Sequence, residues 1–195
     1  MILITTTRRP SRRTRSFIRD LYCVIPTSKK MNRGKMSMRD LNELAIKEGV
    51  ERVVVVGTQR GNPSSLAFYE PSFSHLKLIS LIKLNGVTLR REITDKRAPY
   101  ARRLGIVYSH EDLGDKARIL ARSFKTNILS QSLERLRAEV ESCEVAFLLS
   151  SNGGMRGTFY KVRPSEELGP RMRISEIREY GEGIDDSEDR VWERS

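Results

Sequence analysis

The chain has 195 residues, with 36 lysines and arginines against 25 aspartates and glutamates, so its formal net charge is +11. Its two cysteines, Cys23 and Cys143, cannot form a disulfide framework or a cysteine-based zinc site, and no apolar run approaches the ~20 residues of a membrane span. These features exclude disulfide-rich and helical membrane proteins. We expect a soluble, intracellular, cytoplasmic protein whose charge attracts polyanions, of which nucleic acid is the commonest.

The first predicted elements are a strand over Ile2 to Thr7 and a helix that Pro10-Ser11 opens and Pro26 ends. Apolar side chains recur at helical spacing along this helix and define one buried face. They are Phe17, Ile18, Leu21, Tyr22, Val24 and Ile25. The opposite face carries Arg12, Arg15 and Arg19, which we therefore expect to face solvent.

A second helix is predicted to begin after Ser37 and to end at Gly49. Asp40 lies three residues after Ser37, which is the spacing of a capping box, and glycine suits the left-handed residue that closes a helix. The next run, Val53 to Val56, is apolar at every position. This pattern is typical of a strand buried on both faces.

Two turns are predicted in the next stretch of the chain. The first is Arg60-Gly61-Asn62-Pro63, which is followed by a strand over Leu66 to Glu70. The second is Asn85-Gly86, because this pair tolerates the positive φ angles of a tight hairpin. It would join strands over Leu76 to Leu84 and Val87 to Ile93.

The later part of the chain repeats the same order of elements. A strand near Leu104 to Ser109 is followed by helices at about 113–124 and 130–140 and then by two strands. In addition, the segment Leu41 to Tyr69 can be set beside Leu133 to Tyr160 with the loss of one residue, in a turn. The sequence thus predicts an α/β fold made of two similar halves, at about 1–98 and 99–175, which arise from an internal β-α-α-β-β duplication.

The first helix carries its positive charge at an unusual place. Arg8, Arg9, Arg12, Arg13 and Arg15 surround its predicted start, where cations oppose the helix macrodipole by some tenths of a kcal/mol each. Free N–H groups of a first helical turn attract phosphate, and Ser11 and the nearby arginines can add charge-assisted hydrogen bonds. The pattern favours phosphate contact here, with an ordinary solvated basic surface as the alternative.

A second basic segment lies between the two helices of the first half. The loop from Pro26 to Met36 contains Lys29, Lys30, Arg33 and Lys35, whereas the second half crosses with the short stretch "KTNIL". The halves therefore differ in charge at the place where we expect function to lie.

Signals for catalysis are weak. His75 and His110 are the only histidines, neither has a ligand-spaced partner, and there is no Walker A or Gly-x-Gly-x-x-Gly sequence. We expect no catalytic residue, no metal site, no cofactor and no small-molecule substrate. The segment 181–195 is acidic and is predicted to be a flexible tail.

Four motifs resemble the Brix domain family of ribosome-biogenesis proteins, and in particular its compact archaeal members. The motifs are "TTTRRPS" (5–11), "NRGKMSMRDL" (32–41), "QRGNPSSLAFY" (59–69) and "NGVTLRREI" (85–93). The resemblance implies one Brix domain over 1–180, built of two halves that are each akin to an anticodon-binding α/β domain. It also implies a role in pre-ribosomal RNA folding and processing without catalysis, and it places Arg33-Gly34 and Arg60-Gly61 in basic motifs of the family.

The functional hypothesis is a non-enzymatic ribosome assembly factor that binds pre-ribosomal RNA and works beside other assembly proteins. The alternative is a protein-interaction scaffold in a pre-ribosomal particle, with only non-specific RNA contact. The candidate RNA-binding residues are Arg8, Arg9, Ser11, Arg12, Arg13, Arg15, Arg19, Lys29, Lys30, Arg33, Lys35 and Arg60.

Overall fold

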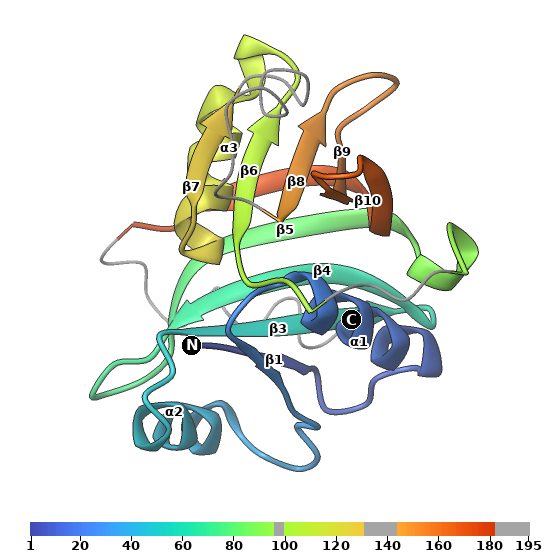
Figure 1. Ribbon diagram of the computed structural model, residues 1–195. Coiled ribbons are helices and arrows are strands. Elements are labelled where there is room, and N and C mark those ends of the chain that lie inside the picture. The colour runs from blue at the N-terminus through green and yellow to red at the C-terminus, as the bar shows by residue number, and fades with distance from the viewer. Residues whose placement is uncertain (96–99, 131–143, 182–195) are drawn as a thin grey trace.

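The computed structural model describes residues 1–95, 100–130 and 144–181, which form a mixed α/β structure around one ten-stranded sheet (Figure 1). The strands are β1 (Ile2–Thr6), β2 (Ser28–Lys30), β3 (Arg52–Gln59), β4 (Asn62–Glu70), β5 (Lys77–Thr88), β6 (Leu104–Tyr108), β7 (Asn127–Ser130), β8 (Val145–Ser150), β9 (Arg156–Lys161) and β10 (Glu166–Glu179). The helices are α1 (Arg12–Val24), α2 (Met38–Lys47) and α3 (Gly114–Phe124), with short 3-10 turns η1 (Arg90–Glu92) and η2 (Glu111–Leu113). No helix in these ranges is long and apolar enough to cross a membrane.

The strand order is β2-β1-β3-β4-β5-β10-β9-β8-β6-β7. In residues 2–88, β1 is parallel to β2 and β3, and β4 and β5 follow in antiparallel pairing. In residues 104–179, β6 is parallel to β7 and β8, and β9 and β10 follow in antiparallel pairing. The two halves thus have the same pairing order, and they meet where β5 pairs antiparallel with β10. Figure 1 shows β6, β7 and β8 of the second half standing at a steep angle to β3 and β4 of the first, whereas β10 runs alongside β5.

Local sequence signals place both helices of the first half. Helix α1 begins after Ser11, whose Oγ accepts a hydrogen bond from Thr14 N at 3.0 Å. Helix α2 begins with the predicted capping box, in which Ser37 N donates to Asp40 Oδ2 at 2.8 Å and Asp40 N donates to Ser37 Oγ at 3.1 Å. Beyond α2, Gly49 adopts a φ of +65°, as the C-terminal glycine signal predicts.

The predicted hairpin at Asn85-Gly86 is wrong, because β5 continues through these residues as one strand. Thr88 to Ser80 pair with β10 along this stretch, so opening a turn there would sacrifice that ladder. Asn85 is instead a bulge, since Gly86 pairs with Arg173 and Leu84 with the next residue, Ile174. Gly86 serves close packing, because a Cβ there would lie 3.0 Å from the Arg173 Nη2 atom.

Two short strands were not predicted. β2 covers Lys29 and Lys30, which the sequence placed in a loop, and β7 follows α3. Each is an edge strand of three or four residues, too short to show a period in the sequence. The strand expected over Val87 to Ile93 is in fact the end of β5 followed by η1. The helix predicted at 130–140 falls almost entirely on 131–143, outside the described residues, as does the acidic tail beyond Gly181.

Strand β3 is covered on both faces, and its run Val53 to Val56 is apolar and buried at every position. Val54 and Val56 of β3 belong to a large core under α1 and α3, whereas Val53 and Val55 face the smaller core under α2. The sequence prediction of a strand buried on both faces is confirmed. Figure 1 shows α2 set apart from the other two helices, at the bottom of the view.

The larger core is continuous between the two halves, and Phe124 of α3 lies at its centre. Its ring centroid is 5.0 Å from that of Phe68 on β4, 5.8 Å from that of Phe147 on β8 and 6.4 Å from that of Phe159 on β9. Near it, Ser123 Oγ is 2.6 Å from Ser80 Oγ of β5 in a buried hydrogen bond. A helix of the second half is therefore packed on strands of the first.

An ion-pair cluster at the surface also joins the two halves. Lys125 Nζ at the end of α3 lies 2.7 Å from Glu51 Oε1, and the terminal ammonium of Met1 lies 2.8 Å from Glu51 Oε2. The hydrogen bond from Lys125, with that from the terminal ammonium, lowers the pKa of Glu51 to about 2. This carboxylate is thus held in its charged form by groups from both halves.

Replacing Phe124 by alanine is expected to lower the free energy of unfolding by about 3–5 kcal/mol, because a buried ring shared by both halves is lost. The fully exposed Phe73 is the control, and Phe73→Ala should change that free energy by less than ~0.5 kcal/mol. Urea denaturation followed by circular dichroism measures both. A loss for Phe124→Ala as small as that of the control would contradict a shared core.

The Glu51 cluster predicts a pH dependence of stability. A carboxyl group whose pKa is lowered in the folded state stabilises the protein above its ordinary pKa, and this contribution is lost as the pH falls toward the folded pKa of about 2. Wild type should therefore exceed Glu51→Gln in unfolding free energy at pH 6, and the difference should shrink steadily toward pH 3. Lys125→Gln removes one partner and should reproduce part of this change. A difference that is constant from pH 6 to pH 3 would contradict the pairing.

Candidate nucleic-acid interface

Several of the predicted basic residues meet at one edge of the sheet. β1, β2 and β3 run parallel, with Thr6 opposite Val56 and Ile4 opposite Lys30, so the segments that leave these strands start at a common edge. The first of these segments carries Arg8 and Arg9, and the turn after β3 carries Arg60; all three side chains are exposed. Carboxyl ends of parallel strands are the usual ligand-binding edge of an α/β sheet.

The start of α1 is anchored beside the β3–β4 turn. Thr14 Oγ1 lies 2.9 Å from Thr58 Oγ1, which fixes the helix against the end of β3. Arg60 at the tip of this turn has a φ of +48° and, with Gly61 at +79°, forms a two-residue hairpin. The geometry therefore holds Arg60 and the first turn of α1 as parts of one surface.

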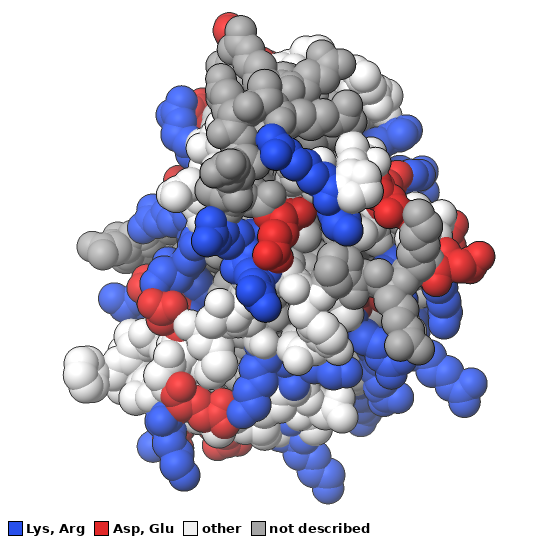
Figure 2. Space-filling view, viewed as in Figure 1, with Lys and Arg blue, Asp and Glu red and all other residues white. Residues whose placement is uncertain are grey.

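Arg12, Arg15 and Arg19 form an exposed row on α1, which we call the α1 stripe. The opposite side of the helix is buried through Phe17 and Leu21, so the predicted orientation is confirmed. No acidic residue lies in the first turn. Figure 2 shows basic side chains gathered at the lower right of the molecule, over the region where Figure 1 shows α1.

A groove of about 300 Å³ runs between α1 and β2 and continues the α1 stripe. It is lined by Arg15, Ile18, Arg19, Lys30, Met31 and Asn32. Because side chains alternate along β2, Lys30 faces α1, and its Nζ lies 5.8 Å from the centroid of the Tyr22 ring. The groove thus combines cations from two elements that are separated in the sequence.

Three of the predicted residues also make contacts within the protein. Arg13 pairs with Glu92 through two contacts, of 2.5 and 2.8 Å, and donates to Val87 O at 2.8 Å. The hydrogen bond between Arg13 and Glu92 raises the pKa of Arg13 and lowers that of Glu92. These contacts tie the start of α1 to the segment after β5.

The other two residues, Lys29 and Arg33, lie in the segment between α1 and α2. Arg33 is 2 % exposed, and its Nε donates to Met36 O at 3.1 Å, so its side chain supports its own loop. Lys29 faces away from α1, and its Nζ lies 2.8 Å from Glu48 Oε1 beyond α2. Ser11 serves as the helix cap, as described above, whereas Lys35 is exposed on the loop.

Sequence reasoning missed a second basic cavity, which lies between the halves and is lined by Arg102, Arg103, Arg122 and Lys125 among others. These residues come from the start of β6 and the end of α3. They form no run in the sequence, so no charge pattern could have indicated them. In the described part of the chain, no group of three or more His, Cys, Asp or Glu residues could hold a metal ion.

Curated relatives identify the family of this chain. A "Probable Brix domain-containing ribosomal biogenesis protein" of Methanopyrus kandleri is 30 % identical over 180 residues, which cover 90 % of this chain and 93 % of the relative. A protein of the same description from Thermococcus kodakarensis is 39 % identical over 99 residues, so this chain matches about half (48 %) of that relative's length. A scan of protein-family models gave no match.

Solved structures agree with this result. A "probable ribosomal biogenesis protein" from Aeropyrum pernix superposes with a TM-score of 0.73 at 27 % identity, over 94 % of this chain and 98 % of the other. The archaeal Imp4-like protein Mil gives a TM-score of 0.65 over 92 % of this chain and all of the other, and at 21 % identity it supports the fold alone. The chain belongs to the Brix domain-containing ribosomal biogenesis proteins, which confirms the resemblance noted in the sequence.

The different roles of Arg13 and Arg15 predict different costs of substitution. Arg13→Ala removes a bidentate pair and a backbone contact, and we expect it to lower the unfolding free energy by about 1 kcal/mol. Arg15→Ala, on the exposed row, should change it by less than ~0.5 kcal/mol. Thermal and urea unfolding compare the two. Equal losses for both variants would contradict the separation of supporting from exposed arginines.

Proposed function

We propose that this chain is a non-enzymatic ribosome assembly factor that binds pre-ribosomal RNA and holds it while the RNA folds and is processed. The observation that carries the proposal is the α1 stripe together with the groove that extends it to Lys30. Other assembly proteins are its expected partners. The proposal involves no membrane, cofactor or small-molecule substrate.

The arginines of the α1 stripe have no carboxylate partner within the described residues, which favours an anionic ligand. Within the described part of the chain, Arg12, Arg15 and Arg19 form no ion pair with a carboxylate, although other surface arginines such as Arg39 and Arg122 do. Arg12 lies in the first turn, where a cation is unfavourable toward the helix macrodipole. Phosphate contact would offset this cost, because arginine forms strong hydrogen bonds with phosphate oxygens.

The exposed arginine and lysine side chains of this surface are suited to contact the phosphate backbone of RNA. Arginine and lysine side chains on phosphates set the position of a nucleic acid without reading its bases. The residues that form the proposed surface are Arg8, Arg9, Arg12, Arg15, Arg19, Lys30, Lys35 and Arg60. Arg13, Arg33, Lys29 and Ser11 support this surface from within. We thus expect binding that depends on strand shape and salt more than on sequence.

We also infer an internal duplication, in which each half resembles an anticodon-binding α/β domain. The shared pairing order of the two halves supports it, as does the matching segment pair Leu41 to Tyr69 and Leu133 to Tyr160. Corresponding strands include β3 with Val53–Val56 and β8 with Val145–Leu148. In this interpretation residues 1–180 are one Brix domain, divided at about 98–99, and 181–195 are an acidic tail.

The two halves differ in charge at corresponding edges. Thr7 N donates to Val56 O after β1, and Ser109 N donates to Leu149 O after β6, so these residues occupy matching places. The chain after Thr7 carries arginines, whereas the chain after Ser109 carries Glu111, Asp112 and Asp115. This contrast supports assigning the RNA contact at this edge to the first half alone.

The α1 stripe predicts a steep salt dependence that depends on its arginines. Each lost phosphate contact should reduce the slope of log affinity against log salt by roughly 0.7 for single-stranded RNA. The triple variant Arg12→Gln, Arg15→Gln, Arg19→Gln should therefore lower the slope by about 2. Fluorescence anisotropy with labelled RNA measures it, after circular dichroism shows that the variant is folded.

The matched control removes the same charge elsewhere, with Lys47→Gln, Lys77→Gln and Arg118→Gln on other exposed surfaces. Its slope should stay close to that of the wild type. If the two triple variants have the same slope, the α1 stripe is not the contact surface. If RNA affinity is weak and nearly independent of salt in all three proteins, the protein-scaffold alternative replaces this proposal.

A further inference from the structure

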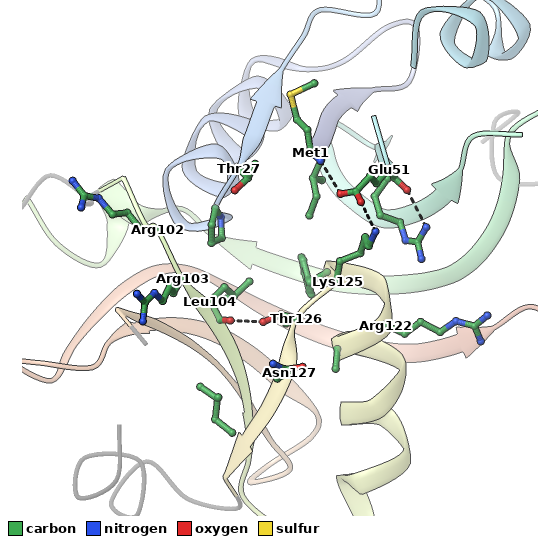
Figure 3. Close-up of a pocket in the computed structure, with 16 residues that line it drawn as sticks. Met1, Thr27, Glu51, Arg102, Arg103, Leu104, Arg122, Lys125, Thr126 and Asn127 are labelled. Carbon is green, nitrogen blue, oxygen red and sulfur yellow. Dashed lines mark hydrogen bonds and ion pairs between the residues drawn. The ribbon is translucent and has the colours of Figure 1, made fainter. Parts of the chain in front are cut away.

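The cavity between the two halves measures about 770 Å³ and lies at the amino ends of the parallel strands. Its walls come from Met1 and Ile2 at the start of β1, from Arg103 and Leu104 at the start of β6, and from the end of α3. Cavities of this size between two structural units are common ligand-binding sites. Figure 3 shows Glu51 of the first half facing Lys125 of the second, whereas the side chains of Arg102 and Arg122 extend outward on opposite sides of the view.

The lining is rich in cations. Arg52, Arg102, Arg103, Arg122 and Lys125 line the cavity, and Glu51 is the one carboxylate among the described lining residues. Two of the cations contact acidic groups at the rim: Lys125 pairs with Glu51 at 2.7 Å and Arg122 pairs with Glu179 at 2.7 Å. The side chains of Lys125 and Glu51 are 40 % and 53 % exposed, and those of Arg122 and Glu179 are 60 % and 41 % exposed. Exposed pairs of this kind contribute little to stability, so a phosphate can replace either carboxylate at small cost.

The backbone at the cavity is also unusual. Thr27 and Lys125 have φ angles of +50° and +51°, and they occupy corresponding places, one between α1 and β2 and the other between α3 and β7. Glycine is the usual residue where a chain leaves a helix in the left-handed conformation, and it is used after α2 at Gly49. A non-glycine residue in this conformation carries a conformational cost.

One buried donor in the cavity wall lacks a partner. The side chain of Arg52 is 8 % exposed; its Nη1 donates to Glu51 O at 2.9 Å and lies 3.1 Å from Glu70 Oε1. Within the described residues its Nε has no hydrogen-bond partner. The guanidinium of Arg52 thus adds a largely buried positive charge to the wall of the cavity.

The occupant that best fits these features is a nucleic-acid backbone. Phe124 is the only aromatic residue among the described residues that line the cavity, and it is 4 % exposed, so none of these residues offers a ring to stack on a base. The Glu51 carboxylate already accepts from two cations, at 2.7 and 2.8 Å, which is the kind of contact a phosphate oxygen makes. The site is thus suited to phosphate oxygens and lacks the features that hold a nucleobase.

We propose that this cavity is a second RNA-contact site, in which Arg102, Arg122 and Lys125 bind phosphates of the strand that also contacts the α1 stripe. The inference rests on the proposed function. Helix α1 leads from one site to the other, since its first turn carries the stripe and the chain after it reaches Thr27 in the cavity wall. Its 13 residues span about 20 Å, so a 12-nucleotide strand, at no less than ~3.4 Å per nucleotide, is long enough to reach both sites.

The test uses a cavity variant with Arg102→Gln, Arg122→Gln and Lys125→Gly. Glycine at position 125 removes the charge and also relieves the left-handed backbone, so the variant should fold. Affinities for a 4-nucleotide and a 12-nucleotide RNA of the same composition are measured by fluorescence anisotropy over a range of salt. The triple variant Lys47→Gln, Lys77→Gln, Arg118→Gln is the control, since Arg118 lies on α3 and pairs with Asp115 away from the cavity.

The longer RNA should bind wild type more tightly than the shorter one, because one strand can occupy both sites. The cavity variant should lose most of this gain, and its salt slope with the longer RNA should fall by about 2. A slope and a length dependence equal to those of the control variant would overturn the proposal. Inorganic pyrophosphate and ATP are competitors in the same assay. The concentration of each competitor is compared with the total concentration of RNA nucleotides in the assay. If either competitor displaces the 12-nucleotide RNA when these two concentrations are similar, the cavity binds small phosphates and the RNA assignment is wrong.

The α1-stripe variant separates this inference from the proposed function. If the stripe variant binds like wild type while the cavity variant is weakened, the stripe is not a contact surface and the cavity is. If only the stripe variant is weakened, the proposed function holds and the second site is rejected. If neither substitution changes RNA affinity relative to the control, both proposals are rejected.

Discussion

The pairing of β5 with β10 is the constraint on which the rest of this structure depends. It joins two sets of strands into one sheet, and it requires β5 to remain extended from Lys77 to Thr88. Because the sheet is continuous, α1 and α3 lie on one shared core, and the Phe124 ring can touch strands of both halves. Without this seam, each half would expose the apolar face that the other now covers.

The same seam sets the two candidate sites at opposite ends of the parallel strands. The carboxyl ends of β1 and β3 lead to the α1 stripe and Arg60, which belong to the first half alone. The amino ends of β1 and β6 border the cavity, which needs both halves. At each end of the parallel strands, the strand order brings basic residues from separate parts of the sequence close together.

In helix α1, arginines at adjacent positions have two different roles. Arg12 and Arg13 are neighbours in the sequence, yet a step of one residue turns the side chain by about 100°. Arg12 faces solvent with Arg15 and Arg19, whereas Arg13 reaches Glu92 and the Val87 carbonyl. The supporting arginine holds the helix in the position from which the others face outward.

The sequence by itself determined the features that depend on near neighbours: the caps at Ser11 and Ser37, the outward row of Arg12, Arg15 and Arg19, the buried run Val53–Val56, and the family. Only the tertiary structure decided what depends on residues far apart in the chain. The partner of Arg13 is 79 positions away and that of Lys125 is 74 positions away, and Asn85-Gly86 became a bulge because β10 pairs with it. Local patterns report the preferences of a few adjacent residues. Long-range strand pairing and burial outweigh those preferences, since they involve more hydrogen bonds and more apolar area than any single turn.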